Sequence, residues 1–157
     1  MNEILEQAKS IIGELTPLYT DCGRLCDGAC CQTDEDGHGG VYLFPGETSE
    51  DFPWGSVESD DFGAMLLCDE WCDRDQRPFA CRIFPLTPVQ NDAGKWTVRM
   101  DARARRMCPM YRSGLKGMNP EFVRAVVQAI RLIAKTKAGE QFLKRWEKLE
   151  AQYKLPF

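Results

Sequence analysis

Cysteine spacing is the strongest signal in this sequence of 157 residues, which contains eight cysteines. The first group of four is Cys22, Cys26, Cys30 and Cys31. The second group is Cys68, Cys72, Cys81 and, after a longer gap, Cys108. Thiolates are the ligands that zinc and iron–sulfur clusters select. Two groups of four therefore predict either two four-thiolate metal sites or one such site with spare cysteines.

The spacing within each group indicates which thiols can share a metal. Cys22 and Cys26 are four residues apart, and so are Cys68 and Cys72. On a helix, such residues lie on one face with Cβ atoms roughly 5–6 Å apart, so a pair can converge on one ion. Neighbouring side chains diverge instead, and Cys30-Cys31 is therefore predicted to point to two different places. Either each of the two serves a separate metal, or one ligates and the other packs.

Three other roles for the cysteines compete with metal binding. Buried free cysteines are common as small apolar residues, but clustering opposes that role for most of the eight. A disulfide framework fits the even count, yet the apolar content of 43% is enough to form a core without such links. A catalytic thiol needs a histidine partner, and the single histidine, His38, lies in a polar loop where it is expected to be solvated.

The start of the chain argues for a reducing compartment. The segment MNEILEQAKSII lacks the basic leader, apolar stretch and cleavage site of a signal peptide. No run approaches the roughly 18 apolar residues of a membrane span. The sequence thus predicts a soluble, cytoplasmic protein without membrane contact, in which thiols stay reduced.

Charge argues against nucleic-acid binding, because the formal net charge is −4 and the pI is near 5.1. The charge is unevenly spread: residues 34–75 carry thirteen acidic residues and one basic one, while residues 95–116 are rich in arginine. The two segments either neutralise each other across the fold, or the arginines offset thiolate charge at a metal site.

Periodicity predicts a mainly α fold with a small β-hairpin, in which an irregular cysteine-rich metal-binding core is flanked by N- and C-terminal helices. A helix is expected over 2–16, a short strand over 41–44 and a hairpin over 86–100. Asn119-Pro120 is typical of a helix start, and Gly139 is expected to break the C-terminal helical segment, 119–153. The chain is expected to form a single domain, 1–157, with the metal-binding core at 22–109.

The strings CGRLCDGACC and RPFACRIFPL resemble the YkgJ-like family of zinc- or iron-chelating cysteine-cluster proteins. That family has a first block ending in adjacent cysteines and a later block of the form RP-x-x-CR-x-(F/Y)-P. All eight cysteines fall on the pattern, although the step from Cys68 to Cys72 is shorter than is usual there. The resemblance implies metal chelation by these residues, with no assigned reaction.

The matching block also carries Arg77 and Arg82, which flank Cys81. Four thiolates around one divalent cation leave a net charge near −2, which is costly in a partly buried site. The two arginines are expected either to donate charge-assisted hydrogen bonds to sulfur or to form surface salt bridges with the acidic segment.

Three functions follow, and the sequence does not separate them. The first is a metal-binding protein in which zinc, or alternatively iron or an iron–sulfur cluster, organises the fold. The second is an iron–sulfur enzyme with a distant similarity to flagellin lysine N-methylases, although no glycine-rich nucleotide loop is present. The third is an interaction module whose C-terminal helices dock a protein partner.

Overall fold

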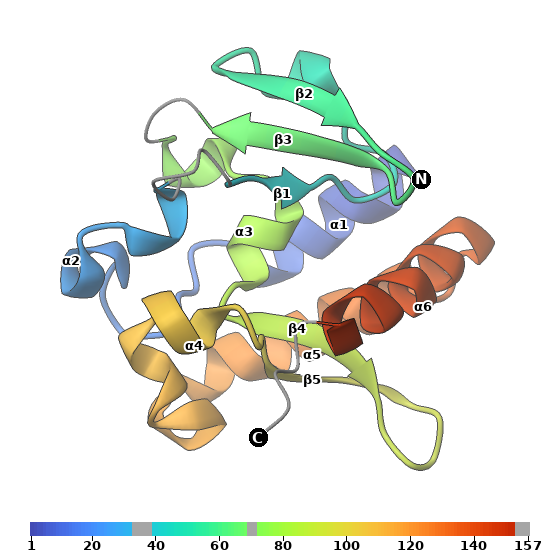
Figure 1. Ribbon diagram of the computed structural model, residues 1–157. Helices are drawn as coiled ribbons and strands as arrows, with labels where there is room; N and C mark the ends of the chain where they lie inside the picture. Colours follow the sequence, from blue (N-terminus) through green and yellow to red (C-terminus); the bar gives the residue numbers. More distant parts are fainter. Residues whose placement is uncertain (33–38, 69–71, 153–157) are drawn as a thin grey trace.

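Two separate antiparallel sheets and the helices packed around them make up the fold of this protein (Figure 1). The computed structural model describes residues 1–32, 39–68 and 72–152. The described α-helices are α1 (Asn2–Ile12), α2 (Gly23–Cys26), α3 (Phe79–Ile83), α4 (Ala104–Met107), α5 (Pro120–Ile133) and α6 (Lys137–Gln152). The described strands are β1 (Val41–Tyr42), β2 (Gly55–Ser59), β3 (Ala64–Cys68), β4 (Leu86–Gln90) and β5 (Trp96–Met100). Short 3-10 turns join them: η1 (Ala29–Cys31), η2 (Ser49–Asp51), η3 (Arg74–Gln76), η4 (Pro109–Tyr111) and η5 (Gly114–Gly117).

The expectation of a mainly α fold is wrong, because a three-stranded sheet in the order β1-β3-β2 accompanies the hairpin. Strands β2 and β3 lie in the acidic segment 34–75, where the sequence analysis predicts no strand beyond residue 44. The edge strand β2 pairs along its length with β3, from Gly55 opposite Cys68 to Ser59 opposite Ala64. Most of β2 is exposed, so it shows little of the apolar alternation that identifies a strand. The protein is mixed α/β.

The hairpin over 86–100 is confirmed, with β4 paired to β5 from Leu86 opposite Met100 to Gln90 opposite Trp96. The Asn91 side chain accepts hydrogen bonds from the N–H groups of Ala93 and Lys95, which closes the turn. The hairpin packs on α5 and α6.

Some of the helix ends lie where the sequence predicts them and others do not. The Asn119 side chain accepts a hydrogen bond from the Glu121 N–H (3.0 Å) and caps α5 as predicted. The helix α1 ends at Ile12 rather than near residue 16, because Gly13 takes a left-handed φ of 52°. Gly139 lies in the first turn of α6, where a Cβ would meet the Ile133 carbonyl oxygen at 2.2 Å. It therefore permits the close approach of α6 to the end of α5, and the break itself falls before it.

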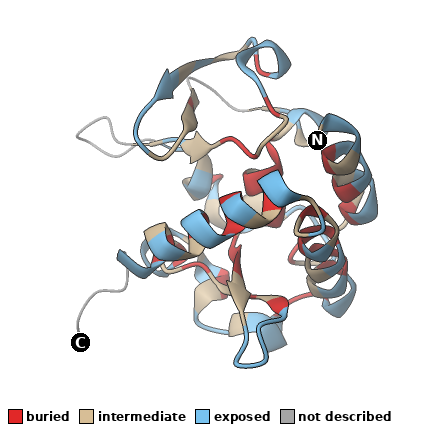
Figure 2. Ribbon diagram, turned by 90° about the vertical axis from the view of Figure 1, so that its right-hand side faces the viewer, coloured by how far each residue is buried: buried red, intermediate tan, exposed pale blue. Residues whose placement is uncertain are grey.

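The main core lies between α1, α3, α5, α6 and the hairpin, and α1 packs along α5. In Figure 2 the buried residues gather on the inner faces of these helices. Phe122, Val126 and Ile130 of α5 and Trp146 of α6 are all buried there, so the apolar stripe of the C-terminal helices belongs to the core. A smaller cluster of Leu43, Phe52 and Leu66 lies against the three-stranded sheet. None of the described helices has the length and apolar character that crossing a membrane requires.

Candidate metal centre

The first two cysteines lie on one helical turn. Cys22 is the N-cap residue of α2, and Cys26 is its last residue. Asp27 and Gly28 then take left-handed conformations (φ 50° and 63°) that turn the chain back into η1, which contains Cys30 and Cys31. The predicted same-face geometry is thus present in α2. The Cys26 thiol donates a long hydrogen bond to the Cys22 carbonyl oxygen (3.9 Å).

The second pair with this spacing is arranged differently. Cys68 ends β3 and lies opposite Gly55 of β2. Cys72 lies beyond residues 69–71, which are outside the described residues, just before η3. One residue of the pair thus belongs to a strand, so a shared helix face is not the means by which these two thiols approach each other.

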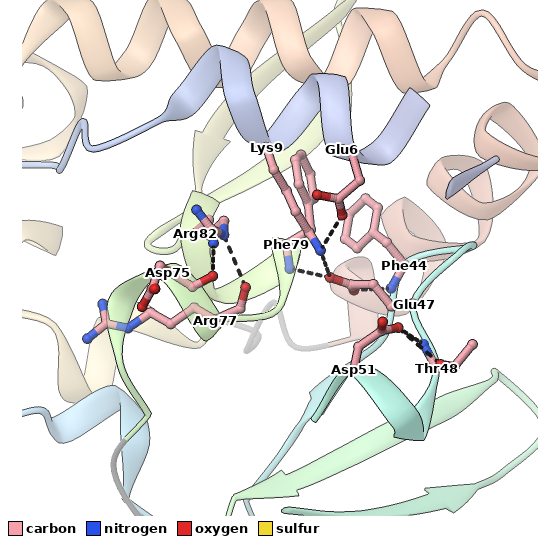
Figure 3. A network of polar contacts seen from close by, with 10 residues as sticks. All are labelled: Glu6, Lys9, Phe44, Glu47, Thr48, Asp51, Asp75, Arg77, Phe79 and Arg82. Atoms are coloured by element: carbon pink, nitrogen blue, oxygen red, sulfur yellow. Dashed lines mark hydrogen bonds and ion pairs between the residues drawn. The ribbon is translucent and has the colours of Figure 1, made fainter. Parts of the chain in front are cut away.

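Cys81 lies on α3, whose N-terminus is capped by a residue far away in sequence. The N-cap residue Pro78 offers no side-chain acceptor, and the Glu47 carboxylate accepts the Phe79 N–H (2.7 Å) instead. The same carboxylate accepts the Phe44 N–H (2.9 Å) and lies 3.3 Å from the Lys9 ammonium. Figure 3 shows these groups gathered around the Glu47 side chain. The pKa of Glu47 is raised above its usual value because burial outweighs the opposing effects of its hydrogen bonds and of Lys9.

This buried carboxylate ties α1, the β1 end and α3 together, and so it fixes the helix that carries Cys81. The sequence analysis missed Glu47 and Lys9. Glu47 is one of many acidic residues in its segment, and no local pattern sets it apart. The eighth cysteine, Cys108, is the C-cap residue of α4, and its N–H donates to the Ala104 carbonyl oxygen (2.8 Å).

All eight cysteines are free thiols, and together they line two adjoining cavities. The small cavity, of about 40 Å³, is lined by six thiols: Cys22, Cys26, Cys30, Cys31, Cys81 and Cys108. The large cavity, of about 230 Å³, is lined by five: Cys30, Cys31, Cys68, Cys72 and Cys81. The wall between them is formed by the residues common to both: Cys30, Cys31, Arg77, Cys81, Phe84 and Met107.

The expected metal-binding core is nevertheless not formed as predicted. Within residues 1–32, 39–68 and 72–152, no three His, Cys, Asp or Glu side chains are grouped so that they could hold a metal ion as they stand. Ligation of a metal requires each thiol to lose its proton. His38 lies outside the described residues.

The thiols have distinct electrostatic surroundings. Burial, and then the charge of Asp21, raises the pKa of Cys22, and burial raises that of Cys72. The pKa of Cys81 is raised, mainly by burial and also by the neighbouring thiols. In the adjacent pair, the Cys30 thiol donates to Cys31, which lowers the pKa of Cys31 and raises that of Cys30. A deprotonated sulfur in this region is thus favoured first at Cys31.

The two predicted arginines have different roles. Arg77 lines both cavities and hydrogen-bonds to the Cys72 thiol. Burial alone would lower its pKa, but the thiols of Cys31 and Cys72 raise it above its usual value. Arg82 donates to backbone carbonyl oxygens, those of Arg77 (3.1 Å) and Asp75 (Figure 3). Arg82 therefore positions the loop that carries Arg77.

A third arginine, Arg74, was not singled out from the sequence, yet it lines the small cavity. Its guanidinium donates to the Leu15 carbonyl (2.6 Å) and lies 3.9 Å from Asp21. Among the described residues, the buried Nε atoms of Arg74 and Arg77 have no hydrogen-bond partner. Two buried donors without acceptors, beside a group of thiols, suit an anionic occupant.

Of the basic residues in segment 95–116, Arg103 lines the large cavity. Arg103 forms ion pairs with the buried carboxylates of Asp101 (2.5 Å) and Glu150 (3.1 Å). Comparison of the chain with family models, with curated proteins and with solved structures found no match.

Proposed function

We propose that this protein binds a transition metal, zinc or iron, through its cysteine thiolates. The observation that carries the proposal is the gathering of eight free thiols, from segments as distant in sequence as Cys22 and Cys108, around two adjoining cavities. Packing alone supplies no reason to place eight small polarizable side chains around two adjoining cavities. Metal coordination does, because thiolate is the ligand that zinc, iron and iron–sulfur clusters select.

The arginines support the proposal through charge. A divalent cation with four thiolates carries a net charge near −2, and burial of that charge requires compensation. Arg74 and Arg77 present buried Nε donors without partners among the described residues; Arg74 lines the small cavity and Arg77 lines both. Donors of this kind form charge-assisted hydrogen bonds to metal-bound sulfur and tune the metal.

The resemblance of the two cysteine blocks to the YkgJ-like family points to the same chemistry. When bound, zinc would stabilise the fold, and an iron–sulfur cluster would also store electrons. The residues that would hold the metal are the eight thiols, each of which must lose its proton and turn toward the cavity. A centre closed by four thiolates has no free position for hydrolytic chemistry.

The decisive experiment is purification without oxygen, followed by metal analysis and visible spectroscopy. We expect at least about one equivalent of zinc or iron per chain. Zinc thiolates are colourless, whereas iron–sulfur centres absorb visible light, so the spectrum also separates the two metals. Less than about a tenth of an equivalent of both metals would overturn the proposal.

A matched pair of variants on α3 controls this experiment. Cys81→Ser removes one thiol and should lower the bound metal, whereas Ala80→Ser adds a hydroxyl to the neighbouring position and keeps all eight thiols. Circular dichroism confirms that both variants are folded. Equal loss of metal in both would trace the effect to disturbance of α3 rather than to the thiol.

A further inference from the structure

The end of α6 is held by a buried acidic side chain. Glu150 is 2% exposed and is the last buried residue of this helix. It meets Asp101, which follows β5 and is 1% exposed. Carboxylates are seldom buried, because the loss of hydration disfavours the charged form. Two buried carboxyl groups side by side therefore require a compensating charge or a proton.

One guanidinium serves both carboxyl groups. Arg103 donates from Nε to both oxygens of Asp101 (3.0 and 3.2 Å) and from Nη2 to Oδ2 (2.5 Å). The main-chain N–H of Arg103 also donates to Asp101 (2.8 Å). Glu150 lies 3.1 Å from the same Nε atom through Oε1, whereas its buried Oε2 atom has no hydrogen-bond donor among the described residues. The charge of Arg103 is thus directed mainly to Asp101.

A proton on Glu150 completes this arrangement. A hydrogen bond joins the Glu150 and Asp101 side chains, and two carboxyl groups can form one only when one of them is protonated. The position of Glu150 also favours the neutral form, because the last turn of α6 contains no basic residue and lies at the negative end of the helix dipole. Burial, and then the charge of Asp101, raises the pKa of Glu150 to about 7, although Arg103 opposes the shift.

The elements around the pair carry other charged residues, which are Arg99 on β5, Arg105 and Arg106 on α4, and Lys144, Arg145, Glu147 and Lys148 on α6. Strand β4, which packs on α6, has no charged residue. Lys144 pairs with Glu140, Arg145 donates to the Phe62 carbonyl, and Glu147 accepts the Gln90 N–H. Arg105, Arg106 and Lys148 are exposed, and Arg99 lies opposite Thr87 in the hairpin. Within the described residues, Arg103 is the cation that forms ion pairs with the two carboxyl groups.

We propose that Asp101 and Glu150 share one proton in the folded protein, and that this proton attaches the end of α6 to the loop after the hairpin. When the proton leaves, two buried carboxylates share one guanidinium, and opening of the last turns of α6 returns Glu150 to water. Arg103, which both carboxyl groups hold in place, lines the large cavity. The pH thus governs both the attachment of α6 and the support of one cavity wall, independently of metal binding.

The pH range of this opening follows from the direction of the pKa shift. The usual pKa of a glutamate is 4.5, whereas that of Glu150 in the closed form is about 7. Between these values the closed form keeps a proton that the open form lacks, so a rise in pH favours opening by up to about tenfold per unit. Below this range both forms are protonated, and above it neither is. The opening equilibrium should therefore level off on both sides.

The first test follows the side-chain carboxyl carbons by NMR in the whole chain, labelled with ¹³C at glutamate and aspartate. We expect the Glu150 resonance, assigned in the unaltered chain, to titrate with a midpoint near pH 7. A midpoint below about 5.5, within the ordinary range of glutamate, would overturn the proposal. No substitution is needed, so this test does not depend on the folding of a variant.

The second test measures amide hydrogen exchange in residues 147–150 from pH 5 to 8, expressed as protection factors that remove the intrinsic pH dependence. In the unaltered chain we expect protection to fall about tenfold between pH 5 and 6 and to level off above 7. Glu150→Gln should show no such fall, because the amide donates to Asp101 without titrating. The matched control Glu140→Gln changes an exposed residue of the same helix and should keep the fall.

Two outcomes of the exchange measurement would contradict the proposal. Equal pH dependence in Glu150→Gln and in the unaltered chain would trace the opening to another titrating group. Constant protection from pH 5 to 8 in the unaltered chain would show that the proton does not hold the helix end. Circular dichroism confirms that both variants are folded before they are compared.

Discussion

The hydrophobic core and the cysteine region are built in different ways. In the core, α5 alone buries six side chains, and its partner α1 is long and regular. In the cysteine region, α2, η1 and η3 have no buried residue at all. Turns of three or four residues are too short to be stable helices in isolation. Apolar burial stabilises the first region and contributes little to these turns.

The difference indicates that the cysteine region needs a source of stability other than apolar burial. Ordering a residue costs roughly 1–2 kcal/mol of backbone conformational entropy, and a turn without buried side chains does not recover it from the hydrophobic effect. Metal–thiolate bonds are the proposed source, since binding energy at such sites becomes folding energy. The core should therefore be indifferent to metal, and the cysteine region should depend on it.

Metal removal is the strongest test of the difference between the core and the cysteine region. After chelation, we expect amide hydrogen exchange in α2 and η1 to accelerate roughly 1,000-fold, because a ligand present at about 1,000 times its Kd contributes about 4 kcal/mol. Exchange in α1 and α5 should change little. Hydrogen exchange with mass spectrometry, with and without chelator, resolves the two regions. Equal acceleration in both would mean that the comparison is false.

The converse experiment weakens the core. Phe122 is fully buried, and Phe122→Ala is expected to lower the free energy of unfolding by about 3–5 kcal/mol. Phe122→Leu serves as the control and should cost less than about 1.5 kcal/mol. The metal-to-protein ratio of the folded fraction should match wild type in both variants. Urea unfolding combined with metal analysis tests this, and a ratio that falls in step with stability would show that the regions are coupled.

The smallest effect concerns the loop that Arg82 positions. Arg82→Met removes the donors to the Arg77 and Asp75 carbonyl groups and should weaken metal retention about tenfold, or about 1.4 kcal/mol. Arg82→Lys keeps the charge but not the planar, multi-donor geometry. If positioning matters, the lysine variant should lose nearly as much as the methionine variant. Competition with a chelator of known affinity measures the loss, and full retention by Arg82→Lys would assign the effect to charge.

Local signals predicted the elements that local interactions specify. The hairpin over 86–100 and the Asn119 cap of α5 are confirmed because turn residues and capping residues act on their near neighbours. The strand expected over 41–44 is present in shorter form as β1, Val41–Tyr42. Strands β2 and β3 were missed because β2 is mostly exposed, and its pairing with β3 is not a local property. The cap that Glu47 provides for α3 was missed for the same reason, since it joins residues 47 and 79.

The arrangement of the cysteines also combines local properties of the sequence with contacts between distant segments. The spacing of Cys22 and Cys26 is a local property that the order of residues specifies before folding. The expectation that Cys30 and Cys31 point to different places is wrong, because the two thiols are hydrogen-bonded to each other and line the same cavities. The meeting of these thiols with Cys81 and Cys108 around shared cavities depends on how α3, α4 and the loops pack. Chain order sets which side chains can act together on one turn. Contacts between segments far apart in the chain set which turns meet, because the burial that brings them together is a property of the whole core.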